Sequence, residues 1–178
     1  MAKDILEQIV FEARKSEYVD VKSGVSSRLS ITAFENLVST AERRLLYSGD
    51  DTTMIRMSDF TGIIPAITGK IELVYEGEQE GAYSVALTLL GNAIKTLYSK
   101  YFPKIEKIEK QGVETPYDEI VSWFFNHNED FEILDNILEK DYKSILKKVK
   151  PLSEFVLKYQ EELIPDELFF WEEFTLWA

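Results

Sequence analysis

Hydrophobic and polar positions alternate with a helical period along most of the chain. An apolar stripe at residues 5–13 predicts a first helix, which ends near residue 18. A second stripe predicts a helix from residue 27 or 30 to residue 47, with Gly49 as its C-terminal cap. The longest stripe predicts a helix over residues 81–102, ended by Pro103.

The segment between the second and the longest predicted helix has a weaker pattern. Ser58-Asp59 predicts the start of a short helix with Pro65 near its middle, which implies a kink at the proline. Residues 71–75 alternate weakly between apolar and polar positions. We expect them to be extended and to pair with residues 52–56 as a short β-ribbon.

The pattern changes after a charged connector. Residues 104–114 are rich in Lys and Glu, which predicts a linker. Beyond it, Thr115-Pro116 with Asp118 predicts a helix start, and further starts are expected near Asn128, Asp141, 151–153 and Pro165. The predicted fold is therefore all-α, with a four-helix bundle over residues 1–103 and a smaller helical domain over residues 115–178.

Charge separates the two predicted domains. The chain of 178 residues has a net charge of -12, of which residues 1–103 carry -3 and residues 104–178 carry -9. All five arginines precede the connector and all three tryptophans follow it. An acidic chain of this kind disfavours nucleic acid as the main partner, because phosphate binding requires a basic face.

Composition also limits the chemistry. Cysteine is absent, which excludes disulfides and thiolate metal sites and agrees with a reducing, cytoplasmic location. No apolar run is long enough for a membrane span. Histidine occurs once, and the glycines in Gly62–Lys70 are too far apart for a P-loop, with Ile71 where a Ser or Thr is required. This chain alone is therefore not expected to be an enzyme.

Several segments resemble the helical lid of AAA+ ATPases, and in particular the ATPase subunit of magnesium chelatase and its MoxR-type relatives. The pattern Gly24-Val-Ser-Ser-Arg28 at a predicted helix start is similar to that family's second sensor motif. Residues 54–59 and 64–77 resemble later lid segments of magnesium chelatase-like ATPases. The resemblance covers residues 1–103 firmly and the remainder loosely, as an appended helical region.

The resemblance implies a function in ATP-driven remodelling of a partner or in metal chelation, to which this chain would contribute a γ-phosphate sensor and contacts with other subunits. Arg28 would contact the γ-phosphate of ATP, and Ser27 would help to start its helix. ATP and Mg²⁺ would be bound by an ATPase domain that carries the Walker motifs, which this chain lacks, so we expect the chain to belong to a longer ATPase protein. The implied partners are that ATPase domain, neighbouring subunits of a ring, and a von Willebrand factor A-type subunit.

Two alternatives stay open on the sequence. Arg28 without a nucleotide role would be an exposed residue paired with Asp20 or Glu17. The whole chain without a nucleotide role would be a free-standing helical adaptor that binds other proteins. Both alternatives leave the predicted all-α fold unchanged.

Other charged groups are interpreted as structural. Arg43-Arg44 is a further candidate for a nucleotide or subunit contact, but the pair lies about four turns beyond Arg28, too far to share its phosphate. A salt-bridged helix surface with Glu42, Asp50 or Asp51 as partners is the preferred interpretation. Residues 126–130, which include His127, form a poor calcium loop and are expected to be a plain connection. The acids of the last predicted helix and of the turn before it are expected to lie on a solvated face: Glu161, Glu162, Asp166, Glu167, Glu172 and Glu173.

Aromatic residues fill the same predicted helix, which spans residues 165–177. They occupy so many directions around the helix that a surface position cannot bury them all. We expect most of them to lie in a core and any exposed remainder to mark contact with a partner.

Overall fold

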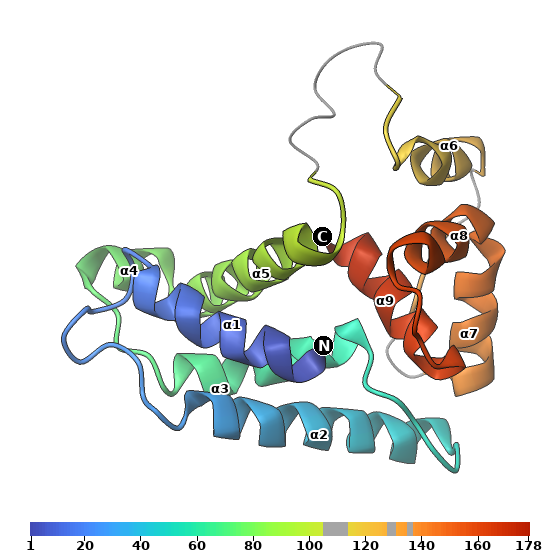
Figure 1. Ribbon diagram of the computed structural model, residues 1–178. Helices are drawn as coiled ribbons and strands as arrows, with labels where there is room; N and C mark the ends of the chain where they lie inside the picture. Colours follow the sequence, from blue (N-terminus) through green and yellow to red (C-terminus); the bar gives the residue numbers. More distant parts are fainter. Residues whose placement is uncertain (105–113, 128–130, 135–136) are drawn as a thin grey trace.

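The computed structural model describes residues 1–104, 114–127, 131–134 and 137–178. These residues are predominantly helical, which confirms the predicted all-α class (Figure 1). Helices α1 to α5 form one group, and helices α7 to α9 form a second group beside it, with α6 at its edge (Figure 1).

Three long helices build the first group: α1 (Ala2–Lys15), α2 (Leu29–Ser48) and α5 (Ala82–Tyr101). Helix α1 lies along α5 in the most extensive helix pair of the structure, and α2 packs against α1, α3 and the 3-10 helix η1. Gly49 ends α2 with a left-handed backbone (φ 74°), which confirms its predicted role as a cap.

Short helices connect α2 to α5. They are η1 (Met57–Ile63), α3 (Ile64–Thr68) and α4 (Tyr75–Glu80). Pro65 therefore lies in the first turn of α3, where a missing N–H removes no intrahelical hydrogen bond, and not in the middle of one kinked helix. Helix α4 has no counterpart among the sequence predictions.

The predicted β-ribbon between residues 52–56 and 71–75 is wrong. The extended residues before α4 pair instead with the loop between α1 and α2, through two antiparallel bridges: Val19 with Leu73 and Val25 with Ile71. Weak alternation identifies an extended segment but not its partner. Residues 52–56 are held differently, since the carbonyl of Met54 accepts a hydrogen bond from the side chain of Arg44 at 2.6 Å.

The second group contains α6 (Asp118–Asn126), α7 (Glu139–Lys148), α8 (Lys150–Tyr159) and α9 (Pro165–Trp177). All four helices begin within a few residues of their predicted starts. Residues 131–134 are not helical, so the start expected near Asn128 does not produce a helix over them. Asn128 itself lies outside the described residues.

Helix α9 is the centre of the second group. Its residues 169–174 are all buried, which confirms that most of its aromatic residues lie in a core. One hydrophobic core spans both groups of helices. For example, the ring of Phe102 lies 5.3 Å from that of Phe155 and 5.8 Å from that of Trp171. Most of the expected linker, residues 105–113, lies outside the described residues, and the domain boundary there stays a prediction.

Candidate functional site

The loop before α2 has a tightly specified shape. The carboxylate of Asp20 accepts the backbone N–H groups of Lys22 at 2.7 Å and Ser23 at 2.9 Å, and these hydrogen bonds lower the pKa of Asp20 below its usual value. A Cβ atom on Gly24 would lie 1.8 Å from the carbonyl oxygen of Asp20, so only glycine fits there. The carbonyl of Gly24 in turn accepts the N–H of Glu72 at 2.9 Å.

Arg28 is placed at the N-terminal end of α2 by this loop. Its backbone N–H donates to Ser26 Oγ at 3.3 Å, and its carbonyl accepts the N–H of Thr32 at 3.0 Å. The side chain is exposed and forms no ion pair with any acidic residue in the described part of the chain. The alternative pairing with Asp20 or Glu17 is therefore not present.

Ser27 is exposed beside Arg28, and no side chain caps α2. Ser26, and not Ser27, makes the contacts that start the helix. Its Oγ accepts the N–H of Arg28, and its carbonyl accepts the N–H of Leu29 at 3.0 Å. The same loop lines an open pocket of about 290 Å³, in which Arg14 and Lys22 are the cationic residues.

A buried ion pair, absent from the sequence predictions, connects α2 to η1. The guanidinium of Arg44 binds the carboxylate of Asp59 with two hydrogen bonds, from Nε at 2.9 Å and from Nη2 at 2.8 Å. Both side chains are at most 5% exposed. Burial alone lowers the pKa of Arg44, but the hydrogen bond and charge of Asp59 raise it above its usual value.

This pair corrects the expected role of Arg44. The sequence suggested an exposed salt bridge to Glu42, Asp50 or Asp51, but Arg44 points into the protein and only its neighbour Arg43 is exposed. The physical reason is helical spacing, because Arg44 follows Leu37 and Ala41 on the buried side of α2.

Arg56 extends the ion pair to α7. Its side chain is 1% exposed, and Nη2 donates to Glu139 Oε2 at 2.8 Å. The guanidinium also lies over the ring of Tyr142, 4.1 Å from its centroid. The start of α7 is held from the same side, because Asp50 accepts the backbone N–H of Glu139 at 2.9 Å.

Glu172 and Glu173 contradict the expectation of a solvated face, since they are 0% and 2% exposed. The sequence did not show this, because residues 169–174 of α9 are buried by packing against η1, α5, α7 and α8, which are distant in sequence or not specified by any local pattern. Glu173 accepts the hydroxyl of Tyr142 and the backbone N–H of Met57, both at 2.8 Å. Glu172 accepts the hydroxyl of Ser153 through one oxygen, while its Oε2 has no partner among the described residues.

Burial raises the pKa of both carboxyls above the usual value. For Glu173 the hydrogen bonds from Met57, Tyr142 and Ser58 oppose this effect, and for Glu172 the hydrogen bond from Ser153 does so. The other acids of the expected solvated face are exposed as predicted: Glu161, Glu162, Asp166 and Glu167.

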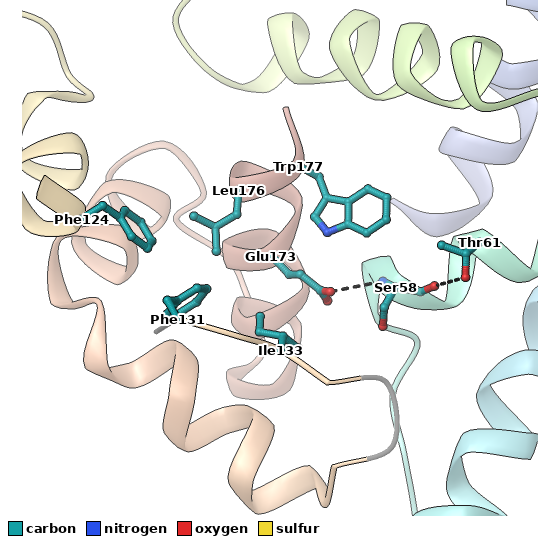
Figure 2. Close-up of a pocket in the computed structure, with 8 residues that line it drawn as sticks. All are labelled: Ser58, Thr61, Phe124, Phe131, Ile133, Glu173, Leu176 and Trp177. Carbon is teal, nitrogen blue, oxygen red and sulfur yellow. Dashed lines mark hydrogen bonds between the residues drawn. The ribbon is translucent and has the colours of Figure 1, made fainter. Parts of the chain in front are cut away.

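An open groove of about 450 Å³ lies between η1, α6 and the end of α9. Figure 2 shows the side chains of Phe124, Phe131 and Leu176 directed toward one another, with Ile133 beside them. Ser58 and Glu173 line the same groove, joined by a hydrogen bond from the backbone N–H of Ser58 at 3.2 Å (Figure 2).

His127 ends α6 and stacks on the ring of Trp123 at a centroid distance of 4.3 Å. In the expected connection that follows, Asn128, Glu129 and Asp130 lie outside the described residues. Within the described ranges no three His, Asp or Glu side chains are grouped as metal ligands. None of the described helices combines the length and apolar character that crossing a bilayer requires.

Comparison of the chain with protein-family models, curated proteins and solved structures finds no match. Three features of the described residues bear on function: an exposed arginine held at the start of α2, a buried polar network between the two groups of helices, and an apolar groove at the end of α9.

Proposed function

We propose that the chain acts as the C-terminal lid and accessory helical region of a magnesium chelatase-like AAA+ ATPase. In this role Arg28 senses the γ-phosphate of ATP, which is bound with Mg²⁺ by an ATPase domain that carries the Walker motifs. The neighbouring subunits of the ring and a von Willebrand factor A-type subunit are the proposed partners.

The observation that supports this proposal is the state of Arg28. Its backbone is fixed by the bridged loop, while its guanidinium is exposed and has no ion pair among the described residues. A cation at a helix N-terminus is disfavoured by the helix dipole, at a cost of about 0.3–1 kcal/mol. An external phosphate group would offset that cost, since it binds both the guanidinium and the positive end of the helix.

The proposal is tested with the chain joined to the Walker-motif ATPase domain of the proposed parent protein. Arg28→Ala is expected to lower ATP turnover about tenfold or more, because it removes a cation that contacts the transferred phosphoryl group. Arg28→Lys keeps the positive charge but not the planar guanidinium fork, and its turnover is expected to be intermediate. Arg14→Ala is the matched control, since it removes an exposed arginine from α1. Unchanged turnover in Arg28→Ala would contradict the proposal.

A helical adaptor without nucleotide is the second candidate, and the apolar groove at the end of α9 favours it. The two candidates differ in the coding sequence that precedes the chain. A P-loop roughly 200 residues before Arg28, the length of one α/β domain, is expected only for the ATPase. An isolated chain that binds ATP tightly would contradict both, because neither candidate provides a complete phosphate site here.

A further inference from the structure

The groove of Figure 2 is lined largely by apolar side chains from segments far apart in the sequence. Its apolar lining residues are Phe124, Phe131, Ile133, Leu176 and Trp177. Trp177 is 41% exposed, so its ring is available to a ligand. A volume of about 450 Å³ is sufficient for several apolar side chains.

Exposed apolar residues also lie on the segments that form the groove. Val121 and Phe125 lie one turn apart on α6 and are 63% and 81% exposed, and Leu134 is 49% exposed. Exposure of this kind is common for single residues, and here it adds exposed apolar surface to the segments that line the groove.

The segments that line the groove carry acidic residues but no basic ones, whereas Arg43 lines a neighbouring pocket that shares Ser58 and Thr61 with the groove. The four segments that line the groove contain no Lys or Arg: residues 57–63, 118–126, 131–134 and 165–177. Asp118, Glu119 and Glu132 are exposed on these segments, and Glu132 lies between two lining residues. A ligand with positive charges at its edges would therefore meet complementary carboxylates.

We propose that this groove binds a basic amphipathic helix of a partner protein. Apolar side chains of that helix fill the groove beside Trp177, and its Lys or Arg residues face Glu132 and the acidic start of α6. This inference goes beyond nucleotide sensing by Arg28 and does not depend on it.

Other occupants fit less well. An anionic membrane would be repelled by the exposed acids. In a second copy of the chain, the lysine-rich helices α7 and α8 already bury their apolar sides, so they cannot place them in the groove. The buried residues are Tyr142, Leu146, Leu152 and Val156. The net charge of -12 also opposes association between two copies.

The test titrates the full chain with a synthetic Leu/Lys peptide of amphipathic helical pattern, followed by calorimetry and tryptophan fluorescence. Two control peptides are a scrambled peptide of the same composition and a Leu/Glu peptide of the same pattern. The patterned Leu/Lys peptide is expected to bind best, and added salt is expected to weaken its binding.

Variants locate the binding site. Trp177→Ala is expected to weaken binding about tenfold, because aromatic side chains carry much of the energy of such contacts, and Glu132→Gln about twofold to fivefold at low salt. The matched controls are Leu87→Ala, which removes a 40% exposed apolar side chain from α5, and Glu154→Gln, which removes an exposed carboxylate from α8. Both controls are expected to bind like the unmodified chain.

Circular dichroism verifies that Trp177→Ala is folded. If it is not, Phe125→Ala, which truncates an 81% exposed ring, is the replacement and is expected to weaken binding severalfold. Failure of the Leu/Lys peptide to bind, equal binding of the Leu/Glu peptide, or unchanged binding in the folded groove variant would overturn the proposal. A concentration-dependent dimer that Trp177→Ala abolishes would also overturn it, because a second copy would then be the occupant.

Discussion

The carboxylate of Glu173 accepts the backbone N–H of Met57 at 2.8 Å, although the two residues lie 116 positions apart in the chain. The N–H of Ser58 donates to the other oxygen at 3.2 Å. These groups belong to the first turn of η1, where backbone N–H groups have no partner within the helix. Helix α9 therefore supplies the N-terminal cap of a helix in the other group, and this cap joins the two groups.

Replacement of Glu173 by Gln is expected to lower the free energy of unfolding by about 2 kcal/mol. The amide loses the negative charge, and its NH₂ group cannot accept hydrogen bonds, so buried donors lose their partner. Urea unfolding of the variant measures the change. Glu162→Gln is the control, since Glu162 is exposed before α9, and it is expected to change stability by less than about 0.5 kcal/mol. Equal losses in the two variants would contradict the capping role.

Replacement of the adjacent residue, Glu172, by Gln is expected to raise the free energy of unfolding. Glu172 is fully buried, and its Oε2 has no partner among the described residues. In Glu172→Gln the remaining carbonyl oxygen can still accept the hydroxyl of Ser153, while no charge is buried. We therefore expect the variant to be more stable at about pH 8, by roughly 1–2 kcal/mol.

The gain from Glu172→Gln should depend on pH. The pKa of Glu172 in the folded protein is raised above its ordinary value of 4.5, so the folded state binds the proton more tightly than the unfolded state. The stability associated with this carboxyl is therefore fully present below pH 4.5 and is lost as the pH rises through the folded-state pKa. Unfolding curves across this range should show the two proteins converging at low pH. A difference independent of pH would exclude ionisation of Glu172 as its cause.

Arg43 and Arg44 allow a comparison of neighbouring residues of the same type. Arg44→Ala leaves the buried carboxylate of Asp59 without its main partner, and is expected to cost about 3–5 kcal/mol in urea unfolding. Arg43→Ala removes an exposed side chain and is expected to cost less than about 0.5 kcal/mol. Similar stability of the two variants would show that the Arg44–Asp59 pair contributes little.

The sequence predicts most of the helices because local signals specify them. Helical periodicity identifies α1, α2 and α5, and Gly49 ends α2 as its position suggested. The start of α6 is likewise local, since Asp118 accepts the backbone N–H of Thr115 at 2.8 Å. The exposed position of Arg28 follows from the same kind of reasoning, whereas its role as a phosphate sensor stays a prediction.

The polar network was not predicted, because its partners are distant in sequence. Arg56 and Glu139 are 83 residues apart, and no local pattern relates them. One signal was available for Arg44, which continues the buried stripe of Ala33, Leu37 and Ala41 along α2. This signal is hard to recognise in the sequence, because Arg44 directly follows the charged residues Glu42 and Arg43. The burial of Glu172 and Glu173 similarly depends on the packing of α9 against η1, α5, α7 and α8, and not on either residue alone.

The last prediction concerns the loop that positions Arg28. Gly24→Ala is expected to lower the free energy of unfolding by about 1–3 kcal/mol, because its Cβ would lie 1.8 Å from the carbonyl oxygen of Asp20. The displaced loop should also weaken the hydrogen bond from Glu72 N–H to the Gly24 carbonyl, which makes the amide of Glu72 exchange faster with solvent.

Gly91→Ala is the matched control for Gly24→Ala. Gly91 is exposed within α5, and a Cβ atom there would meet nothing within 4 Å. Alanine is the better helix former, so this variant is expected to gain up to about 1 kcal/mol. If Gly24→Ala instead matched Gly91→Ala in stability and left the exchange of Glu72 unchanged, the shape of this loop would not depend on glycine.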